Sequence, residues 1–532
     1  MSTRATCSPQ ARSNELMHPN EEHYDAVIVG SGFGGSINSL RLAQAGRLVL
    51  VLERGGRYKP GEFPRDVSDV DKVFWRYPRR TESRGLYEVR FFSGIAAVVA
   101  SGVGGGSLIY ANIHIRPDPV VFDDPRWPRS VNRESLDPYY DKVAAMLGVA
   151  PLPADIKLAK RDMYREAAVR AGREVFDPDQ AVSWKEPGYG RQACQLVTEC
   201  EFGCPHGAKN TLDFNYLAQA ERSGARLRPG CYVTHVEPHT SGYRVHYTDL
   251  ASGASASITG RRVVLSAGTL GTNEILLRCR HVYRTLPDLS RKLGDGYSGN
   301  GDFLGSIQNS RTDLEPWKGP DVTSVIRYFE SAPQFTMAAP TFNRAVMTVL
   351  ASRRQGGGRL LKVLSPLLWP LMEWIIPWAF RSGYLTKPAR SRAGDPARMT
   401  NLFAIGRDNA NGRVRLKRGR LDIEWDYARE NRELTQKMLA AMQEVADVYG
   451  GTFAPLITWN IFNRIITVHS LGGCHLSDSP QGGVVSTHGE VPGYPGLFVA
   501  DGSVIPSSIG FHPVMTISAV SERIAEAVVS SY

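Results

Sequence analysis

Two histidines near the C-terminus have the side chains best suited to acid–base chemistry: His469 in TVHSLGGCHL and His512 in SIGFHPVM. A neutral imidazole can take up a proton at working pH, because its ordinary pKa lies near ~6.5. Either residue could therefore act as a general base toward a substrate hydroxyl group. The alternative for any single histidine is a structural role, with the ring held by hydrogen bonds in the core.

A glycine motif near the N-terminus is typical of a dinucleotide site. Gly30, Gly32 and Gly35 form G-x-G-x-x-G in GSGFGG, and Glu53 follows in the same region. The glycines allow a tight turn and close approach of backbone N–H groups to a pyrophosphate, while an acidic residue at this spacing can accept hydrogen bonds from the ribose. The motif alone does not separate NAD from FAD.

The segments around the motif have the hydrophobic pattern of a strand–helix–strand unit. Residues 24–30 (YDAVIVG) form a short apolar run, residues 36–45 carry apolar side chains at helical spacing, and residues 47–53 (RLVLVLE) are again apolar. We therefore expect the glycines to form the turn into the helix, with Glu53 at the end of the second strand. This context disfavours a glycine-rich turn without a ligand.

A second glycine run, at residues 98–112 (VVASGVGGGSLIYAN), has bare backbone that could lie against a flat ring or a phosphate. A loop built only for flexibility is the alternative. Residues 262–267 then form an apolar strand that leads into a helix through Leu277, and residues 496–501 form another strand before a helix at 513–529. Nucleotide-fold elements at the start, middle and end predict a discontinuous cofactor domain.

Together these segments resemble the glucose-methanol-choline (GMC) oxidoreductase family, and within it the bacterial cholesterol oxidases most of all. The resemblance runs in patches from about residue 24 to the end and is weakest between 313 and 455. Its markers are GSGFGG, GVGGGSL (102–108), HGAKNTLDFNYL (206–217), SAGTLGTNEILL (266–277), GNGD (299–302), HSLGGC and DGSVIP. They are specific for the family and only suggestive for the substrate.

The resemblance implies FAD as the cofactor. Gly30, Gly32, Gly35 and Glu53 would hold its ADP half, and Val233 would meet the adenine through its backbone. Four further groups would contact the rest of the cofactor: Gly105 with Gly106, Asn112, Asp501 with Gly502, and Pro513. Because proline favours the first position of a helix, the helix after His512 is expected to point its positive end at the flavin.

The resemblance also implies that both histidines contact the substrate hydroxyl. We expect His469 to be the base and His512 the positioning partner, although the roles could be exchanged. Cholesterol oxidases carry Asn at the second place, so His512 resembles the wider family and weakens a narrow sterol assignment. Glu330 in YFES is the candidate for the double-bond isomerisation of some sterol relatives, and that activity stays open.

The predicted function is FAD-dependent oxidation of a lipophilic alcohol to the ketone, with a sterol such as cholesterol or another 3-hydroxysteroid as substrate and O2 as acceptor. The alternative is a long-chain alcohol dehydrogenase that passes electrons to a quinone or carrier protein. A rival of another class is a NAD-binding or catalytically silent nucleotide-binding protein at a membrane. The variable middle of the chain builds the pocket, so the sequence does not identify the alcohol.

Residues 360–380 (LLKVLSPLLWPLMEWIIPWAF) form an apolar insert. It nearly reaches the ~20 residues of a membrane span, but Lys362, Glu373 and three prolines argue against one. Trp369, Trp374 and Trp378 prefer an interface. The flanking cations are Arg353, Arg354, Arg359, Arg381, Lys387, Arg390 and Arg392. We predict peripheral contact with a membrane, with a buried core or oligomer-interface helix as the alternative.

Composition excludes several other classes. The chain has 532 residues, 42% hydrophobic and 22% charged, and 63 Lys+Arg against 53 Asp+Glu give a net charge of +10 without a nucleic-acid motif. We therefore expect no nucleic-acid partner. Seven cysteines do not form a secreted disulfide framework, and Cys194, Cys200 and Cys204 lack a clear fourth metal ligand, so no metal is predicted. The polar start indicates a cytoplasmic protein.

The expected fold class is α/β, with a discontinuous Rossmann-like FAD-binding domain and an α+β substrate-binding domain built on an antiparallel sheet. We assign residues 1–22 to a disordered tail. The predicted FAD-binding domain comprises 23–125, 205–310 and 462–532, and the substrate-binding domain comprises 126–204 and 311–461, with the apolar insert at 360–380.

Overall fold

The computed structural model describes residues 22–65, 69–352, 364–365, 367–385, 387 and 394–532. The tail predicted at 1–22 therefore lies outside the described residues, apart from Glu22. The same is true of positions 360–363 and 366 of the apolar insert, and of five of its flanking arginines: Arg353, Arg354, Arg359, Arg390 and Arg392.

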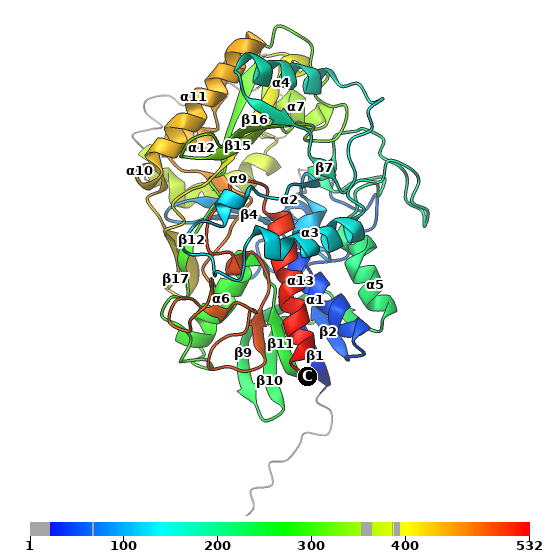
Figure 1. The fold of residues 1–532 in the computed structure, drawn as a ribbon, viewed down its shortest axis with the longest axis vertical. Helices are drawn as coiled ribbons and strands as arrows, with labels where there is room; N and C mark the ends of the chain where they lie inside the picture. The colour runs from blue at the N-terminus through cyan, green and yellow to red at the C-terminus, as the bar shows by residue number, and fades with distance from the viewer. Residues whose placement is uncertain (1–21, 66–68, 353–363, 366, 386, 388–393) are drawn as a thin grey trace, which may run out of the picture.

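A seven-stranded sheet forms the lower half of the molecule (Figure 1). Its strand order is β8-β2-β1-β11-β10-β9, and β23 also pairs with β11. The parallel strands are β8 (Arg226–Arg228), β2 (Val49–Leu52), β1 (His23–Val29), β11 (Ser255–Leu265) and β23 (Leu497–Val499). β10 (Gly242–Asp249) and β9 (Cys231–His239) add antiparallel strands. All four residues of β2 are buried, as expected for a strand covered on both faces.

Helices cover this sheet, and three of them begin next to its strands' carboxyl ends. They are α1 (Phe33–Gln44), α6 (Gly268–His281) and α13 (Val514–Ser530). α1 begins at Phe33 rather than at residue 36, so Gly34 and Gly35 lie in its first turn. Position 35 must be glycine for the helix to start this early. A Cβ there would lie 1.9 Å from the carbonyl oxygen of Gly30, so any other residue would clash with it.

A second, fully antiparallel sheet forms the upper half, with strand order β19-β13-β16-β15-β14-β6. Its strands are β6 (Glu174–Phe176), β13 (Phe303–Gln308), β14 (Val325–Tyr328), β15 (Phe335–Ala338), β16 (Thr400–Gly406) and β19 (Thr452–Pro455). The amphipathic α11 (Arg432–Tyr449) buries Met438, Met442 and Val445 and packs on this sheet beside α4 (Ala159–Arg170).

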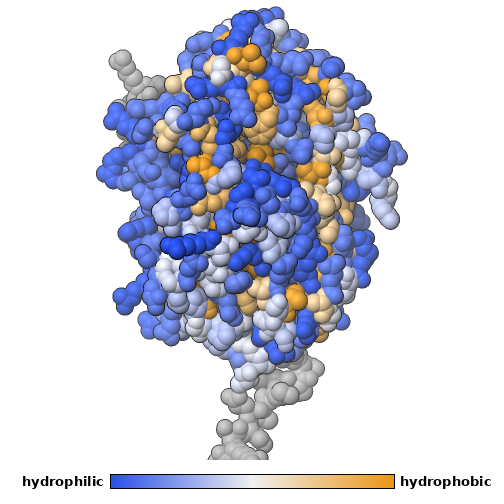
Figure 2. All heavy atoms as spheres, viewed as in Figure 1, coloured by the Kyte–Doolittle hydropathy of each residue, from blue (hydrophilic) through white to orange (hydrophobic). Residues whose placement is uncertain are grey.

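These two sheets confirm the predicted fold class. The domain boundaries stay a prediction, and the antiparallel sheet already includes β13 before the boundary that we placed at 310. Figure 2 shows a largely hydrophilic surface on the face of Figure 1, with apolar groups visible between the polar ones mainly in the upper half.

A small third sheet connects distant parts of the chain. Its strands are β3 (Tyr87–Phe91), β4 (Ala96–Ala100) and β20 (Ile466–Thr467). β20 pairs in parallel with β4 through Ile466 with Ala96 and Thr467 with Ala97. Because β4 leads into the second glycine run and β20 leads into His469, this pairing brings the two segments together.

The remaining α-helices of the described regions are α2 (Val70–Val73), α3 (Arg133–Leu147), α5 (Tyr216–Arg222), α7 (Arg344–Ala351), α9 (Met372–Arg381), α10 (Tyr427–Glu430) and α12 (Ile457–Phe462). The remaining strands are β5 (Ile113–His114), β7 (Asp179–Gln180), β12 (Asp295–Tyr297), β17 (Gly412–Lys417), β18 (Arg420–Glu424), β21 (Leu476–Ser477) and β22 (Val485–Ser486).

Candidate active site

One cavity of about 340 Å³ runs from the first glycine turn to the two histidines. Its lining includes eleven of the thirteen residues singled out from the sequence: Gly30, Gly32, Glu53, Gly105, Gly106, Val233, Asp501, Gly502, Pro513, His469 and His512. The other two, Gly35 and Asn112, do not line it. The fold thus gathers segments separated by several hundred residues around a single elongated space.

The first glycine turn has the shape of a phosphate cradle. Gly30 has φ +95°, and a Cβ there would lie 2.3 Å from the carbonyl oxygen of Ser266. Gly32 caps the N-terminus of α1, and no atom lies within 4 Å of where its Cβ would be, so this backbone faces open space. A helix N-terminus with exposed N–H groups attracts a phosphate group.

The second glycine run packs directly on the first. Gly105 has φ +53°, and a Cβ there would lie 2.7 Å from the Cα of Gly32, so the two loops meet backbone to backbone. Asn112 follows the cavity-lining residues Tyr110 and Ala111 and is fully buried. Neither amide atom of Asn112 has a hydrogen-bond partner within the described part of the chain.

Two carboxylates, those of Glu53 and Asp501, line the cavity. Glu53 is buried after β2, and its two oxygens accept hydrogen bonds from the N–H groups of Ser31 (3.0 Å) and Gly55 (2.8 Å). Asp501 follows β23, and its carboxylate accepts from the N–H of Ser503 (2.8 Å) and the hydroxyl of Thr272 (2.5 Å). Both acids stand at the carboxyl ends of parallel strands, where ligands of such sheets bind.

His469 is held by Asp302. The ring Nδ1 lies 2.8 Å from Oδ1 of Asp302, whose side chain is completely buried. The other carboxylate oxygen of Asp302 accepts from the Thr467 hydroxyl (2.9 Å) and from the N–H groups of Val468 (2.9 Å) and His469 (3.2 Å). A carboxylate in this position holds the imidazole with its proton on Nδ1, which leaves Nε2 as the basic nitrogen.

His512 is held by the loop in front of it. The side chain of Asn300 accepts hydrogen bonds from the N–H groups of Ile509 (2.8 Å) and Gly510 (3.0 Å) and donates one to the carbonyl of Phe511 (2.8 Å). Pro513 then caps α13. Asn300 thus sets the path of the chain as it enters His512, and the positive end of α13 faces the cavity.

The two imidazole rings lie edge to face, and both line the cavity. Their centroids lie 5.3 Å apart at an interplanar angle of 79°, and Phe403 stacks on His469 with a centroid distance of 5.5 Å. Burial lowers the pKa of His512 well below its ordinary value, and the neighbouring His469 and His114 lower it further. His512 is therefore neutral in the working range of pH.

The geometry thus places a glycine turn suited to a phosphate group and an oriented histidine in the lining of one cavity. Family models described as GMC oxidoreductase match residues 24–280 and 408–521. The chain belongs to the GMC oxidoreductase family. Its cofactor is accordingly FAD, and its activity is that of an FAD-dependent alcohol oxidoreductase.

This GMC oxidoreductase is similar to proteins named cholesterol oxidase. It is 29% identical to one from Acinetobacter baumannii, with 95% of this chain and 94% of that protein covered. The identity to one from Mycobacterium tuberculosis is also 29%, with 94% and 90% covered. A long-chain-alcohol oxidase from Arabidopsis thaliana is 22% identical, with 95% and 67% covered. Among solved structures, pyridoxine 4-oxidase has a TM-score of 0.64 at 16% identity, with 94% and 98% covered, and shares the fold.

The residues of this GMC oxidoreductase fit FAD. The open space at Gly32 and Gly106 is the feature that a flat, phosphate-bearing cofactor would use. Glu53 stands where it can accept hydrogen bonds from ribose hydroxyls, and Val233 lines the same end of the cavity.

Sequence reasoning missed three side chains of this GMC oxidoreductase. Asp302 and Asn300 lie in the quoted GNGD segment, which was treated as a family marker and not as part of the site. Glu201 also lines the cavity. Burial raises its pKa to about 8, with a further contribution from Asp321. The position of Glu330 does not fit the isomerisation role for which it was the candidate. Its side chain is 51% exposed, lies 3.6 Å from Arg173 and does not line the cavity.

The three clustered cysteines are half-buried free thiols. Burial raises the pKa of Cys194 to about 11, so its thiol stays protonated. Within the described ranges, no group of three or more His, Cys, Asp or Glu side chains is arranged to hold a metal ion.

The described part of the apolar insert contains the 3-10 turn Trp369–Leu371, followed by the amphipathic helix α9. Trp369 is buried and donates a hydrogen bond to the carbonyl of Phe92 (2.7 Å), whereas Trp374 and Trp378 are more than half exposed. Leu367 and Leu371 are exposed on the same face. Neither this helix nor any other in the described regions combines the length and apolarity needed to cross a bilayer.

Proposed function

We propose that this GMC oxidoreductase oxidises the hydroxyl group of a lipophilic alcohol, such as a sterol, to the ketone, with O2 as electron acceptor. The observation that carries the proposal is the hydrogen bond between His469 and Asp302, because it orients a basic nitrogen in the cavity that also contains the glycine cradle. When bound, FAD supplies the ring that accepts a hydride from the alcohol carbon.

In this proposal His469 takes the hydroxyl proton. Its Nδ1 donates to Asp302, so Nε2 has a free lone pair directed away from the carboxylate. The charge that His469 gains on protonation is stabilised by the buried Asp302 carboxylate, as in other oriented base pairs. Asp302 acts as a positioning residue.

His512 positions the substrate. Its ring is neutral because burial lowers its pKa, so it can donate one hydrogen bond to the substrate oxygen without competing for the proton. Its side chain lines the cavity, and no described residue makes a side-chain hydrogen bond with the ring. The loop held by Asn300 keeps His512 within reach of His469.

The cavity near the histidines supports a lipophilic substrate. Its walls there include Val322, Pro340, Phe403 and Val468, and such side chains bind apolar surface by excluding water. The similarity to proteins named cholesterol oxidase favours a sterol as the substrate over other alcohols. The long-chain-alcohol oxidase similarity keeps a linear alcohol as the second candidate.

The exposed face of α9 supports contact with a lipid bilayer. Trp374 and Trp378 lie on α9, Leu367 and Leu371 lie just before it, and all four are at least half exposed. Tryptophan favours the level of the lipid head groups. The nearby Arg381 can meet lipid phosphates, although it also pairs with Asp71 at 2.7 Å. Such contact would deliver a membrane-dissolved alcohol, and a cytoplasmic location stays a prediction.

Anaerobic bleaching of the flavin tests the substrate class. The holoenzyme is mixed with sterols, long-chain alcohols and sugars, and bleaching is followed by absorbance. We expect a lipophilic alcohol to bleach the flavin, sugars to have no effect, and His469→Ala to stay yellow without being bleached. Rapid bleaching by glucose alone would overturn the substrate class.

The acceptor needs a separate experiment. Peroxide formation in air is compared with reduction of an artificial quinone acceptor by the same holoenzyme and alcohol. Peroxide formed in proportion to ketone supports an oxidase. Turnover only with the quinone would replace O2 by the alternative acceptor.

A further inference from the structure

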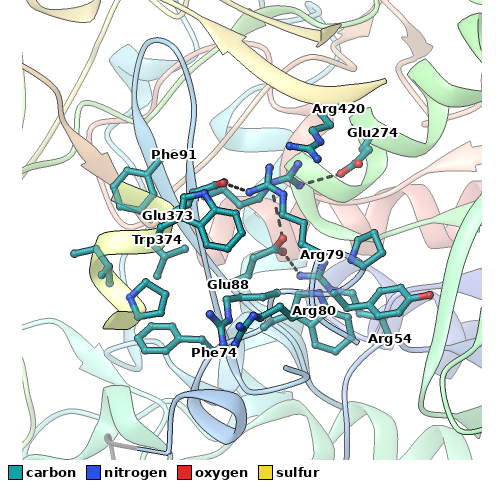
Figure 3. Close-up of a pocket in the computed structure, with 18 of the residues that line it drawn as sticks. Arg54, Phe74, Arg79, Arg80, Glu88, Phe91, Glu274, Glu373, Trp374 and Arg420 are labelled. Carbon is teal, nitrogen blue, oxygen red and sulfur yellow. Dashed lines mark hydrogen bonds and ion pairs between the residues drawn. The ribbon is translucent and has the colours of Figure 1, made fainter. Parts of the chain in front are cut away.

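A second cavity of about 300 Å³ lies behind α9 (Figure 3). Its walls come from α9, residues 74–80, β3, and Arg420 of β18. None of the glycines, Glu53 or the two histidines lines it, so it is distinct from the active-site cavity. The two cavities share a wall that includes Arg54, Glu88 and Arg90.

Positive charge dominates this second cavity, with seven arginines and three glutamates in its lining. The glutamates are already paired. Glu88 lies 2.7 Å from Arg54, Glu274 lies 2.9 Å from Arg90, and Glu373 pairs with Arg79. Figure 3 shows these carboxylates joined to guanidinium groups by dashed lines. Two further arginines also have carboxylate partners, Arg278 with Glu274 at 2.5 Å and Arg76 with Asp71 at 2.7 Å. This leaves Arg80 and Arg420 without a close carboxylate among the described residues.

Two arginines keep donors free for a ligand. Arg420 makes no ion pair or side-chain hydrogen bond with any described residue, and the carboxylate nearest to Arg80 is Glu82, at 3.8 Å. The positive charges in the cavity repel one another. The pKa of Arg79 is lowered by burial and further by the charges of Arg420 and Arg90. An anion bound near the guanidinium groups of Arg79 and Arg420 would reduce this repulsion.

The opposite wall of the cavity is apolar. Phe74, Phe91, Trp374, Ile376 and Pro377 contribute to it. Figure 3 shows Phe91 and Trp374 on one side of the cavity, with Phe74 below them. Trp374 is 61% exposed, so this wall opens toward the outer face of α9. A ligand that fills the space needs an anionic group and an apolar group next to each other.

We propose that this cavity binds the phosphate head group of an amphiphile. Arg80 and Arg420 hold the phosphate, and Phe74 and Trp374 contact the adjoining apolar chain. Guanidinium groups suit phosphate because their planar N–H groups match its oxygens in pairs. The amphiphile is either a lipid of a bilayer or a free phosphate ester with a hydrocarbon chain. The site is independent of the alcohol that the enzyme oxidises.

The test is a binding measurement on the FAD-loaded enzyme. Dihexanoyl phosphatidic acid, kept monomeric, is compared with dihexanoyl phosphatidylcholine and inorganic phosphate by isothermal titration calorimetry. We expect phosphatidic acid to bind at least about tenfold more tightly than either comparison ligand. The variant R80Q/R420Q should lose about tenfold or more of this affinity. The control R170Q/R432Q removes the same charge from exposed positions on α4 and α11 and should bind as the wild type does.

Vesicles distinguish the two sources of the ligand. Flotation with phosphatidylcholine vesicles, with and without phosphatidic acid, is repeated for all three proteins. A gain from phosphatidic acid that depends on Arg80 and Arg420 identifies a bilayer lipid, and dependence seen only with the monomer identifies a free ester. The proposal fails if R80Q/R420Q equals the wild type in both arms, or if inorganic phosphate binds as tightly as phosphatidic acid.

Discussion

The carboxylate of Asp302 lies 2.8 Å from Nδ1 of His469, although the two residues are 167 positions apart in the chain. The same carboxylate accepts both backbone N–H groups of residues 468 and 469, so it holds the ring and the loop that carries it. Since Asn300, two residues earlier, holds the loop before His512, one short segment positions both histidines.

Asp302→Asn should slow anaerobic flavin bleaching by about a hundredfold or more while FAD stays bound. An amide cannot both accept from Nδ1 of His469 and satisfy the donors on its other side, and it does not stabilise a protonated ring. Stopped-flow absorbance measures the rate. The control Asp295→Asn changes a carboxylate of β12 outside the cavity. An unaltered rate in Asp302→Asn would remove the basis for His469 as an oriented base.

Substitutions of His512 should separate positioning from proton uptake. His512→Asn retains a hydrogen-bond donor and should bleach within about tenfold of the wild type, whereas His512→Ala should be about a hundredfold slower. The acid limb of the pH–rate profile should be the same in His512→Asn as in the wild type, because the lowered pKa of His512 keeps it neutral there. Loss of that limb in His512→Asn would assign the base to His512 instead.

Gly32→Val should give a folded but colourless protein. No atom lies within 4 Å of the Cβ position, so the fold tolerates the side chain, but the isopropyl group would fill the space beside the N-terminus of α1. The ratio of FAD to protein should fall by about tenfold or more with an unaltered circular dichroism spectrum. Gly56→Ala, at an open position without positive φ, is the matched control. A yellow Gly32→Val protein would contradict the proposed phosphate cradle.

Exchange of two exposed tryptophans should weaken membrane binding. We expect the double variant W374S/W378S to bind phosphatidylcholine vesicles about tenfold or more weakly, because it removes apolar surface that would enter the head-group layer. Flotation gives the bound fraction. The variant V169S/Y189S alters two exposed apolar residues elsewhere and should bind normally. Equal binding by W374S/W378S and wild type would rule out contact through α9.

Stability should fall as pH rises, in part because of Glu201. Burial raises its pKa from an ordinary 4.5 to about 8, so between these values the folded protein keeps a proton that the unfolded chain releases. The free energy of unfolding therefore decreases with pH across this range. Neighbouring Asp321, whose pKa burial raises to about 6, acts in the same direction.

Glu201→Gln cannot lose that proton, so its stability should vary less between about pH 5 and about pH 8. Urea unfolding midpoints of the holoenzyme at several pH values measure the difference. The exposed Glu330→Gln should keep the wild-type dependence. Parallel curves for Glu201→Gln and wild type would show that Glu201 ionises normally.

The amino-acid sequence by itself determined the strand–turn–helix elements and the glycine turn between them, and it contains the histidine that we propose as the base. Runs such as residues 24–30 and the positive φ of Gly30 depend on neighbours close in the chain, so local pattern is sufficient to predict them. The amphipathic insert was also visible, although which of its tryptophans is buried was not.

Only the tertiary structure decided which side chains meet. The pairing of β20 with β4 brings His469 to the second glycine run. The pairing of β13 in the antiparallel sheet places Asp302, which directly precedes this strand, beside the imidazole of His469. The half-buried Glu201 beside Asp321 and the arginine-rich cavity behind α9 likewise bring together segments that are distant in the chain. No short-range pattern encodes such contacts, because they depend on the packing of whole sheets, and that packing turns separate motifs into one site.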